Sequence, residues 1–339
     1  MIFAADDYKD CFDHGIDYSG FDLEDGKYVS TESAEACQTE CKNNERCQYW
    51  SWVPDYHNSC WLKHGKGQTS QSPNIISGPK YCDDEPNPPT PDSKDIRVMS
   101  YNLWGWNALN NYGMTQNLYK NIRKFNPDLL GTQEIEAHQY TVAENIGNDY
   151  AVAEDAYSAG HAIIYRTSIF DLVKSGNTRL SPEDKWGTRT VEYAQLNHKA
   201  SGRQVDIFNT HWCVCTEGQC CGETPGYTSA QEVESYMNEI RRPGSLLLFT
   251  GDLNVFSGFE NHRAIRYLKG ELQEDIPPIP LEDTFRTANP DGDGTTFPGA
   301  GKIDYLFAEK GSNVVSAGTD WDNYGAASDH LPIFAVIKT

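Results

Sequence analysis

The sequence predicts a layered α/β domain preceded by a small disulfide-rich domain. Six of the ten cysteines fall within the first 82 residues, a density typical of small domains stabilised by disulfides. Residues 83–94, DDEPNPPTPDSK, combine four prolines with acidic and small polar residues, and this composition favours an extended linker. Residues 95–339 alternate strand-like and helix-like segments, which indicates strands and helices packed in layers. We therefore expect domains at residues 1–82 and 95–339, joined by a linker at 83–94.

The composition limits the partners of the chain. The 339 residues carry a formal net charge of -21, shared almost equally by the two expected domains, and 12% of them are aromatic. So many aromatic residues argue against a disordered chain, and the negative charge disfavours charge-driven binding of nucleic acid. A bound divalent cation can still reverse the local field for a phosphate ester. No apolar run approaches the roughly 20 residues of a transmembrane helix, and we expect a monomer.

The cysteines also indicate the compartment. Ten cysteines in two even groups are ordinary for a secreted protein and many for a cytosolic one. The five residues at the start, Met1-Ile-Phe-Ala-Ala, are too short for a signal peptide. We therefore expect a secreted, extracellular protein from which the signal peptide has been removed.

In the first domain, the segment starting at Thr31 reads as a capped helix that carries Cys37 and Cys41 on one side. The pattern SAEACQTEC, then a cysteine, QYWSW and SCWLK, resembles the PAN/apple domain over about residues 9–82. The resemblance implies a protein or carbohydrate partner. It also implies three disulfides, namely Cys37–Cys60, Cys41–Cys47 and Cys11–Cys82.

Four aromatic residues of this domain have two interpretations. Trp50, Trp52, Tyr56 and Trp61 would stack on a sugar ring, or they fill a small core, which is the favoured interpretation.

In the second domain, hydrophobic patterning predicts the elements in order. Helices are expected at residues 115–124, 137–146 and 229–241. Strands are expected at residues 96–103, 128–133, 161–166, 189–197, 203–210, 245–250, 303–308, 313–318 and 332–338.

Polar side chains follow or interrupt the apolar segments, where active sites of α/β domains form. They are Asn102, Glu134, His211, Asp252, Asn254, Asp304, Asp329 and His330. Any one of them alone is more typical of a turn or a cap, so the prediction of a site depends on the whole set. Glu134 and Asp329 offer the oxygen ligands that Mg²⁺, Mn²⁺ or Ca²⁺ prefer. Asp252 is suited to orient or deprotonate a water, and an Asp304–His330 pair to transfer protons.

Two other enzyme classes lack their motifs. Neither Ser nor Cys lies in a nucleophile elbow, which disfavours a covalent triad mechanism. A Gly-x4-Gly-Lys-Ser/Thr loop is missing, which disfavours an ordinary nucleoside triphosphatase.

The segments MSYNLWG, GTQEIE, IFNTHW, TGDLNVF, KIDYLF and SDHLPIF resemble the endonuclease/exonuclease/phosphatase superfamily, which has the deoxyribonuclease-like fold. The resemblance covers residues 95–339 and implies a four-layer sandwich in which helices flank two packed mixed β-sheets. It implies Glu134 as the principal metal ligand, with Asp329 near the metal. Asn102 would help to position the metal or the phosphate.

The same resemblance implies the catalytic roles. Asp252 would orient or activate the attacking water, and Asn254 would bind the phosphate. Asp304 would orient His330, which would act as a general base or stabilise a phosphate oxygen. His211 would hydrogen-bond the scissile phosphate.

Three further residues are candidate substrate contacts. Arg189 lies where many members of the superfamily carry a phosphate-contacting Arg, although a surface ion pair is an equally good interpretation. Tyr157 corresponds loosely to a substrate-stacking Tyr. His161 is a buried histidine at the start of a strand by default, and an extra substrate contact as the alternative.

Two departures from the deoxyribonuclease pattern bear on the substrate. Pancreatic-type deoxyribonucleases carry an Arg two residues after the metal-binding Glu, and Glu136 stands here with the opposite charge. The Glu that supports the histidine corresponding to His211 is also missing. Both changes weaken a duplex-DNA interpretation and leave phosphoester hydrolysis intact.

The segment HWCVCTEGQCCG, residues 211–222, allows a zinc site or two disulfides. Its spacing lacks the paired Cys-x2-Cys knuckles of zinc sites, so two disulfides are favoured. Because a bond between adjacent cysteines would be strained, Cys213 and Cys215 are each expected to bond to Cys220 or Cys221. We expect these bonds to stiffen the rim of the site beside His211.

The sequence thus predicts a secreted, divalent-metal-dependent phosphoric ester hydrolase with a phosphate-ester substrate. Nucleotides or small organic phosphates are the favoured substrates, attacked directly by water. The alternatives are a deoxyribonuclease-like endonuclease on extracellular nucleic acid, a sphingomyelin-type phospholipase, and a catalytically inactive adhesive or carbohydrate-binding protein.

Overall fold

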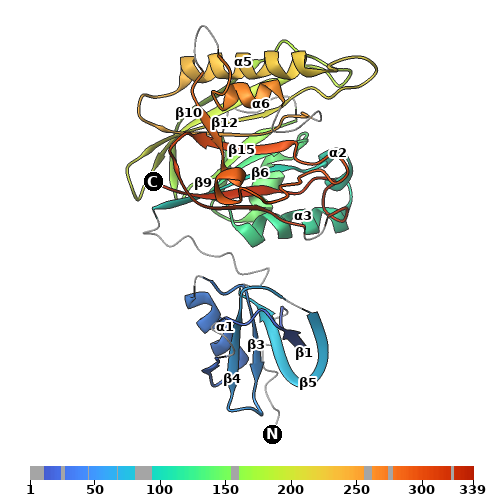
Figure 1. Ribbon diagram of the computed structural model, residues 1–339, viewed down its shortest axis with the longest axis vertical. Helices are drawn as coiled ribbons and strands as arrows, with labels where there is room; N and C mark the ends of the chain where they lie inside the picture. The colour runs from blue at the N-terminus through green and yellow to red at the C-terminus, as the bar shows by residue number, and fades with distance from the viewer. Residues whose placement is uncertain are drawn as a thin grey trace. The chain divides into compact units, whose positions relative to one another are not determined.

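The computed structural model describes residues 11–23, 27–44, 46–66, 68–80, 94–153, 160–255, 262–273, 278–321 and 324–339. The chain divides into two compact units, Met1–Pro88 and Pro89–Thr339, and each is described by itself (Figure 1). Within the described ranges, no helix is long and apolar enough to cross a membrane. Most of the linker expected at 83–94 lies outside the described residues, so its bounds stay a prediction.

The first unit is built on an antiparallel sheet with strand order β1-β5-β3-β4-β2. Its strands are β1 (Asp13–Ser19), β2 (Val29–Ser30), β3 (Tyr49–Val53), β4 (Ser59–Lys63) and β5 (Gln68–Pro79), and its helix is α1 (Ala34–Asn43).

Helix α1 begins later than the sequence predicts because Ser33 is its N-cap, and the Ser33 side chain accepts a hydrogen bond from the N–H of Ala36. Buried disulfides hold α1 in place: Cys37–Cys60 joins it to β4, and Cys41–Cys47 joins its last turn to the segment before β3. Cys82 lies outside the described residues, so the Cys11–Cys82 pair stays a prediction.

The aromatic residues of this unit divide between core and surface. Trp50 is fully buried, and its indole N–H donates to the carbonyl of Pro79 at 2.9 Å. Trp52 and Trp61 are partly buried, whereas Tyr56 is 52% exposed. The core interpretation therefore holds for Trp50 and not for Tyr56.

The second unit contains two six-stranded mixed sheets. One has the order β16-β17-β6-β7-β9-β8, with β6 (Asp95–Asn102), β7 (Leu129–Gln133), β8 (Tyr150–Val152), β9 (Ala162–Arg166), β16 (Asn313–Thr319) and β17 (Ile333–Lys338). The other has the order β10-β11-β12-β13-β15-β14, with β10 (Phe170–Arg179), β11 (Thr190–His198), β12 (Gln204–His211), β13 (Leu246–Asp252), β14 (Leu281–Asp283) and β15 (Asp304–Glu309).

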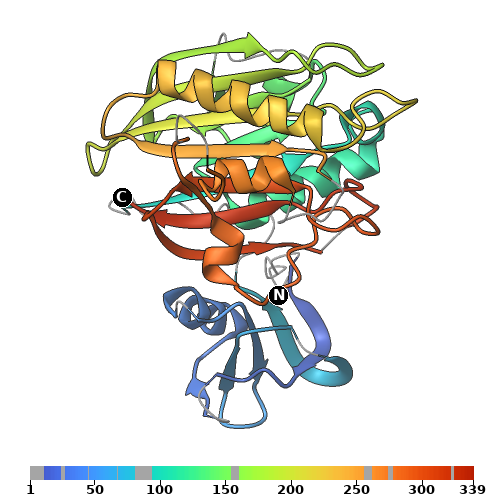
Figure 2. The ribbon, with the colours of Figure 1, turned by 45° about the horizontal axis from the view of Figure 1, so that its top comes forward.

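Helices cover the outer face of each sheet, so the unit has four layers (Figure 2). Helices α3 (Tyr112–Phe125) and α4 (Gln139–Ile146) pack on the sheet that contains β6, and α5 (Glu223–Ile240) and α6 (Arg263–Leu268) pack on the sheet that contains β13. The short helices α2 (Gly105–Ala108) and α7 (Thr284–Ala288) follow β6 and β14. The predicted four-layer sandwich is confirmed.

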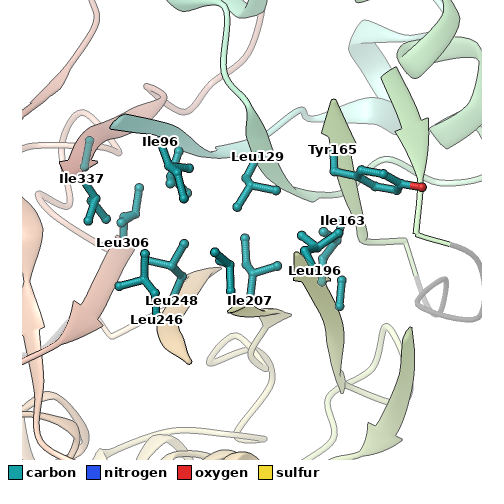
Figure 3. Packing of buried hydrophobic residues seen from close by; sticks show 14 of the residues in the cluster. Ile96, Leu129, Ile163, Tyr165, Leu196, Ile207, Leu246, Leu248, Leu306 and Ile337 are labelled. Atoms are coloured by element: carbon teal, nitrogen blue, oxygen red, sulfur yellow. The ribbon is translucent and has the colours of Figure 1, made fainter. Parts of the chain in front are cut away.

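The core between the sheets is aliphatic (Figure 3). Ile96, Leu129 and Ile163 from one sheet meet Ile207 and Leu248 from the other, and all are fully buried. Because side chains alternate along a strand, every second residue of these strands faces this core.

Several elements differ from the prediction or lack a predicted counterpart. Helix α5 begins at Glu223, six residues before the predicted start at 229. Strand β10 was not predicted because it is an edge strand with mostly exposed, polar residues and a bulge, and so carries little apolar alternation. Strands β8 and β14 have three residues each, and helices α6 and α7 have six and five, too few for a clear period.

Close to one end of the two sheets, polar groups replace the aliphatic core. Asn209 Oδ1 accepts hydrogen bonds from Gln133 Nε2 at 2.8 Å and from Thr250 Oγ1 at 3.0 Å, so this network joins the two sheets. Gly131 leaves the space for it, since a Cβ atom there would lie 2.1 Å from Thr250 Oγ1 and 2.6 Å from Asn209 Oδ1.

We expect Gly131→Ala to lower the stability of the second unit by about 1–3 kcal/mol, because the new methyl group overpacks this network. The measurement is the melting transition of that unit by calorimetry. Gly113→Ala in α3 is the matched control, since its Cβ would meet only Asn111 Oδ1, at 3.6 Å. Equal melting temperatures for the two variants would contradict the role given to Gly131.

Candidate active site

Strand register places three of the predicted residues in one row. In the sheet of β12, β13 and β15, His211 is the Cα partner of Asp252, and Asp252 is the Cα partner of Asp304. Cα partners in neighbouring strands point their side chains to the same face of the sheet. His211 Nε2 accordingly lies 3.5 Å from Asp252 Oδ2.

The facing sheet contributes Asn102, which links two carboxylates. Its Nδ2 donates to Asp252 Oδ2 at 3.0 Å and to Glu134 Oε1 at 3.2 Å. Its Oδ1 accepts from the N–H of Trp104 at 3.0 Å. Asn102 is fully buried, so these bonds determine which way its amide faces.

Glu134 follows β7 in a left-handed conformation, with φ of 52°. Such a backbone is disfavoured for a non-glycine residue and occurs mainly where the surroundings enforce it. Here the N–H of Gly105 donates to the Glu134 carbonyl at 2.9 Å. The turn thus carries the Glu134 carboxyl to the end of the sheets instead of continuing the strand.

His330 is held from three sides just before β17. Its Nδ1 lies 2.9 Å from Asp304 Oδ2, and its backbone N–H donates to Ser328 Oγ at 3.1 Å. Ser328 Oγ in turn donates to the Asn102 carbonyl at 2.8 Å. The ring centroid of Phe297 lies 4.8 Å from that of the His330 imidazole, and His330 Nε2 lies 3.8 Å from Asp252 Oδ2.

The two histidines of the site carry different charges at neutral pH. Burial by itself lowers the pKa of His330, but the carboxylates led by Asp304 and Asp252 outweigh it and raise the pKa to about 10. Burial, together with the positive charge of Arg189, lowers the pKa of His211 well below its usual range. His330 is therefore a cation and His211 is neutral.

The carboxyl groups are held together against their mutual repulsion. Burial, together with the neighbouring Asp304, raises the pKa of Asp252 to about 7. Burial also raises the pKa of Glu134 and of Asp329. Raised pKa values of clustered acids are a common feature of functional sites.

The donor set fits a divalent cation. Asp252, Asp304 and His330 offer ligand atoms within 4.8 Å of one another, and among the described residues the buried Asp304 Oδ1 has no hydrogen-bond partner. The Nδ1 atom of His330 is already paired with Asp304 Oδ2 at 2.9 Å. We therefore favour oxygen ligands, Glu134 and the carboxylates near it, which suit a hard cation.

Arg189 lies immediately before β11 and is paired inside the protein. Its Nη2 donates to Asp184 Oδ2 at 2.7 Å, and its side chain is 9% exposed. The structure therefore shows a buried ion pair where the sequence allowed a surface pair. Asn254 has φ of 49°, and its Nδ2 donates to the carbonyl of Trp212 at 3.0 Å.

Of the remaining predicted contacts, one is paired inside the protein and one lies outside the described residues. His161 is fully buried, its Nδ1 is paired with the Glu192 carboxylate, and its Nε2 lies 3.3 Å from Thr190 Oγ1. This placement speaks for the buried strand-start histidine and against a substrate contact, because the imidazole has no exposed edge. Tyr157 lies outside the described residues.

The cysteines beside His211 form two crossed disulfides, Cys213–Cys220 and Cys215–Cys221. No thiol of this segment is left for a zinc site. We call residues 213–221 the disulfide loop.

Sequence reasoning missed three residues that hold the site, namely Asp184, Asn209 and Ser328. The sequence could have indicated Asn209, since a polar residue two positions before His211 in a strand faces the same side of the sheet. Asp184 and Ser328 lie in loops, where acidic and hydroxyl residues are ordinary turn formers, so neither stood out.

Comparison with known proteins supports the same reading of the fold. A model of the endonuclease/exonuclease/phosphatase family matches residues 99–330. The chain belongs to the endonuclease/exonuclease/phosphatase family. A PAN domain model matches residues 16–63, which confirms the second predicted resemblance. Members of the family are phosphoric ester hydrolases, so the predicted enzyme class is also confirmed.

Solved structures share the fold of the second unit. An endonuclease/exonuclease/phosphatase from Bacteroides vulgatus is 22% identical with a TM-score of 0.56, covering 72% of this chain and 98% of its own. The human nocturnin catalytic domain with bound sulfate is 20% identical with a TM-score of 0.56, covering 72% and 94%. A mannosyl-6-phosphatase from Bacteroides thetaiotaomicron is 22% identical with a TM-score of 0.53, covering 71% and 98%. No curated protein sequence matches the chain.

We expect Asp304→Asn to lower the pKa of His330 from about 10, because the imidazolium loses its nearest negative charge while burial still disfavours the cation. The measurement is an NMR titration of the EDTA-treated protein, with the His330 signal assigned by its loss in His330→Gln. Asp329→Asn is the control and should change this pKa less. An unchanged pKa in Asp304→Asn would show that other groups stabilise the cation.

Proposed function

We propose that this protein is an extracellular, divalent-metal-dependent phosphoesterase that hydrolyses nucleotides or small organic phosphates by direct attack of water. The observation that carries the proposal is the row of His211, Asp252 and Asp304, which meets Asn102 of the facing sheet at hydrogen-bond distance. Together with His330, whose Nε2 lies 3.8 Å from Asp252 Oδ2, this row supplies a cationic donor, a base and a neutral hydrogen-bond donor, the groups that hydrolysis of a phosphate ester can use.

The residues divide the chemistry between them. Asp252 orients the attacking water and accepts its proton, since its carboxylate is held by Asn102 and its pKa of about 7 suits a base at neutral pH. The His330 cation donates to a phosphate oxygen, and Asp304 orients it. Neutral His211 donates a hydrogen bond to the same phosphate without adding a charge that would compete for the carboxylates.

A cation fits the same arrangement. Glu134 is the principal ligand in this proposal, with Asn102 and Asp329 near it, and Mg²⁺, Mn²⁺ or Ca²⁺ suits these oxygens. When bound, it stabilises negative charge on the phosphate and on the leaving oxygen.

Several features favour a small substrate that contains a ring. Glu136 is exposed two residues after Glu134, where it would repel the backbone of a nucleic acid. Trp106 in the short helix α2 and Trp186 in the loop before β11 are 61% and 71% exposed, close in the sequence to Asn102 and Arg189, and such rings stack on bases or sugars. One similar structure is a mannosyl-6-phosphatase. The endonuclease alternative would need a cationic surface that the charge of -21 does not favour.

The first unit supports an extracellular protein with a carbohydrate or protein partner. Two disulfides in this unit and two in the disulfide loop of the second unit join cysteines among the described residues, and such bonds persist in oxidising compartments. Tyr28 packs its ring 5.7 Å from Tyr56 and 5.4 Å from Trp61. Tyr28 and Tyr56 are 38% and 52% exposed, which is suited to stacking on a sugar.

The experiment that tests the function compares hydrolysis of p-nitrophenyl phosphate and bis-p-nitrophenyl phosphate, with and without EDTA. We expect turnover of at least one ester, its loss in EDTA and its recovery with excess Mg²⁺ or Mn²⁺. The ratio of the two rates separates a phosphatase from a phosphodiesterase. An absence of metal-dependent turnover on both esters and on DNA would favour the inactive, adhesive alternative.

We expect Glu134→Gln and Asp252→Asn each to lower kcat by about 100-fold or more, since each removes a charge that acts in the transition state. Glu136→Gln is the matched control: the same substitution two residues from Glu134, on an exposed side chain, should leave kcat on the nitrophenyl esters unchanged. Full activity in both site variants would mean that the site lies elsewhere.

A further inference from the structure

One buried carboxylate joins two loops beside the site. Asp184 lies in the loop that precedes β11, and its side chain is 0% exposed. Its Oδ2 accepts hydrogen bonds from Arg189 Nη2 at 2.7 Å and from the backbone N–H of Val214 at 2.8 Å, and its Oδ1 accepts from the N–H of Trp186 at 2.9 Å. Val214 belongs to the disulfide loop, so Asp184 ties Arg189 to that loop.

The disulfide loop is itself tied to the catalytic residues. Just before it, the N–H of Trp212 donates to the carbonyl of Asp252 at 2.9 Å, and the Trp212 carbonyl accepts from Asn254 Nδ2 at 3.0 Å. Two disulfides close the loop within nine residues, which removes most of its freedom. A group anchored to Val214 therefore keeps a constant position relative to Asp252 and Asn254.

Arg189 stands beside His211 and has donors to spare. Strands β11 and β12 are antiparallel with Val191 opposite Thr210, so Arg189, just before β11, lies next to the end of β12 that carries His211. A guanidinium has five N–H donors, and within the described part of the chain the Arg189 guanidinium donates one hydrogen bond, to Asp184. Its Nε is buried without a partner among the described residues.

The surroundings of Arg189 make an anchor necessary. Glu134 and Asp252 are buried acids of the same site, and unlike charges attract strongly where water is excluded. A guanidinium held by nothing else would pair with these acids and occupy the place of the substrate or the cation. The Asp184 carboxylate, fixed by two backbone N–H groups, holds it back.

We propose that Asp184 is a positioning residue, which anchors Arg189 on the disulfide loop so that its guanidinium faces the phosphate of the substrate and not the carboxylates of the site. The proposal rests on the proposed phosphoesterase function and adds a residue to the recognition of the phosphate. Asp184 then influences the affinity for phosphate only by positioning Arg189.

The test is a double-mutant cycle with Asp184→Asn, Arg189→Ala and the double variant. The readouts are KM and kcat on the nitrophenyl esters and the Kd of inorganic phosphate by calorimetry. Asp184→Asn keeps an oxygen that can accept from Val214, so folding should survive, which the melting temperature checks. We expect each single variant to raise KM and the phosphate Kd by about tenfold, and the double variant to match Arg189→Ala.

Lys185→Ala is the control, because it breaks the Lys185–Glu217 bridge of 2.7 Å between the same two loops without touching Arg189. Its KM and phosphate Kd should equal those of the wild type. The proposal would be overturned if the fold-changes of the two single variants multiplied in the double variant. It would also be overturned if Asp184→Asn left the phosphate Kd unchanged. If no ester is hydrolysed, the proposed function fails, whereas the phosphate titrations still decide on Asp184.

Discussion

The arrangement of the site depends on the register of three strands, β12, β13 and β15. Hydrogen bonds between these strands put His211, Asp252 and Asp304 at the same level on the same face. A slip by one residue would turn all three toward the opposite face. Such a slip is costly because it would also turn Leu248 away from the aliphatic core and Asn209 away from its polar network.

The buried carboxylates of the site repel one another, and nearby positive charges offset part of this repulsion. The His330 imidazolium lies between Asp304 and Asp252, and the positive charge of Arg189 also acts on His211. The pKa values of the acids nevertheless stay raised. A site in which this repulsion remains is suited to a divalent cation, because a cation coordinated by the carboxylates would reduce the repulsion between them.

Disulfides have different tasks in the two units. In the first unit, Cys37–Cys60 and Cys41–Cys47 lie in the core, where a small domain has too little apolar surface to depend on packing alone. In the second unit, the core is large and the two disulfides lie in one surface loop. There they stiffen the segment whose backbone contacts Asp252, Asn254 and Asp184.

The sequence by itself determined the fold class, most of the buried strands and the longer helices of the second unit, and the polar residues at the strand ends, because period and burial are local properties of the chain. It also carried the even cysteine groups and the two family resemblances. It left open the partners of Cys213 and Cys215, the burial of His161 against Glu192, and the link from Arg189 through Asp184 to Val214. Only the tertiary structure decided these, since each depends on segments that are distant in the sequence or on loops whose path no local pattern encodes.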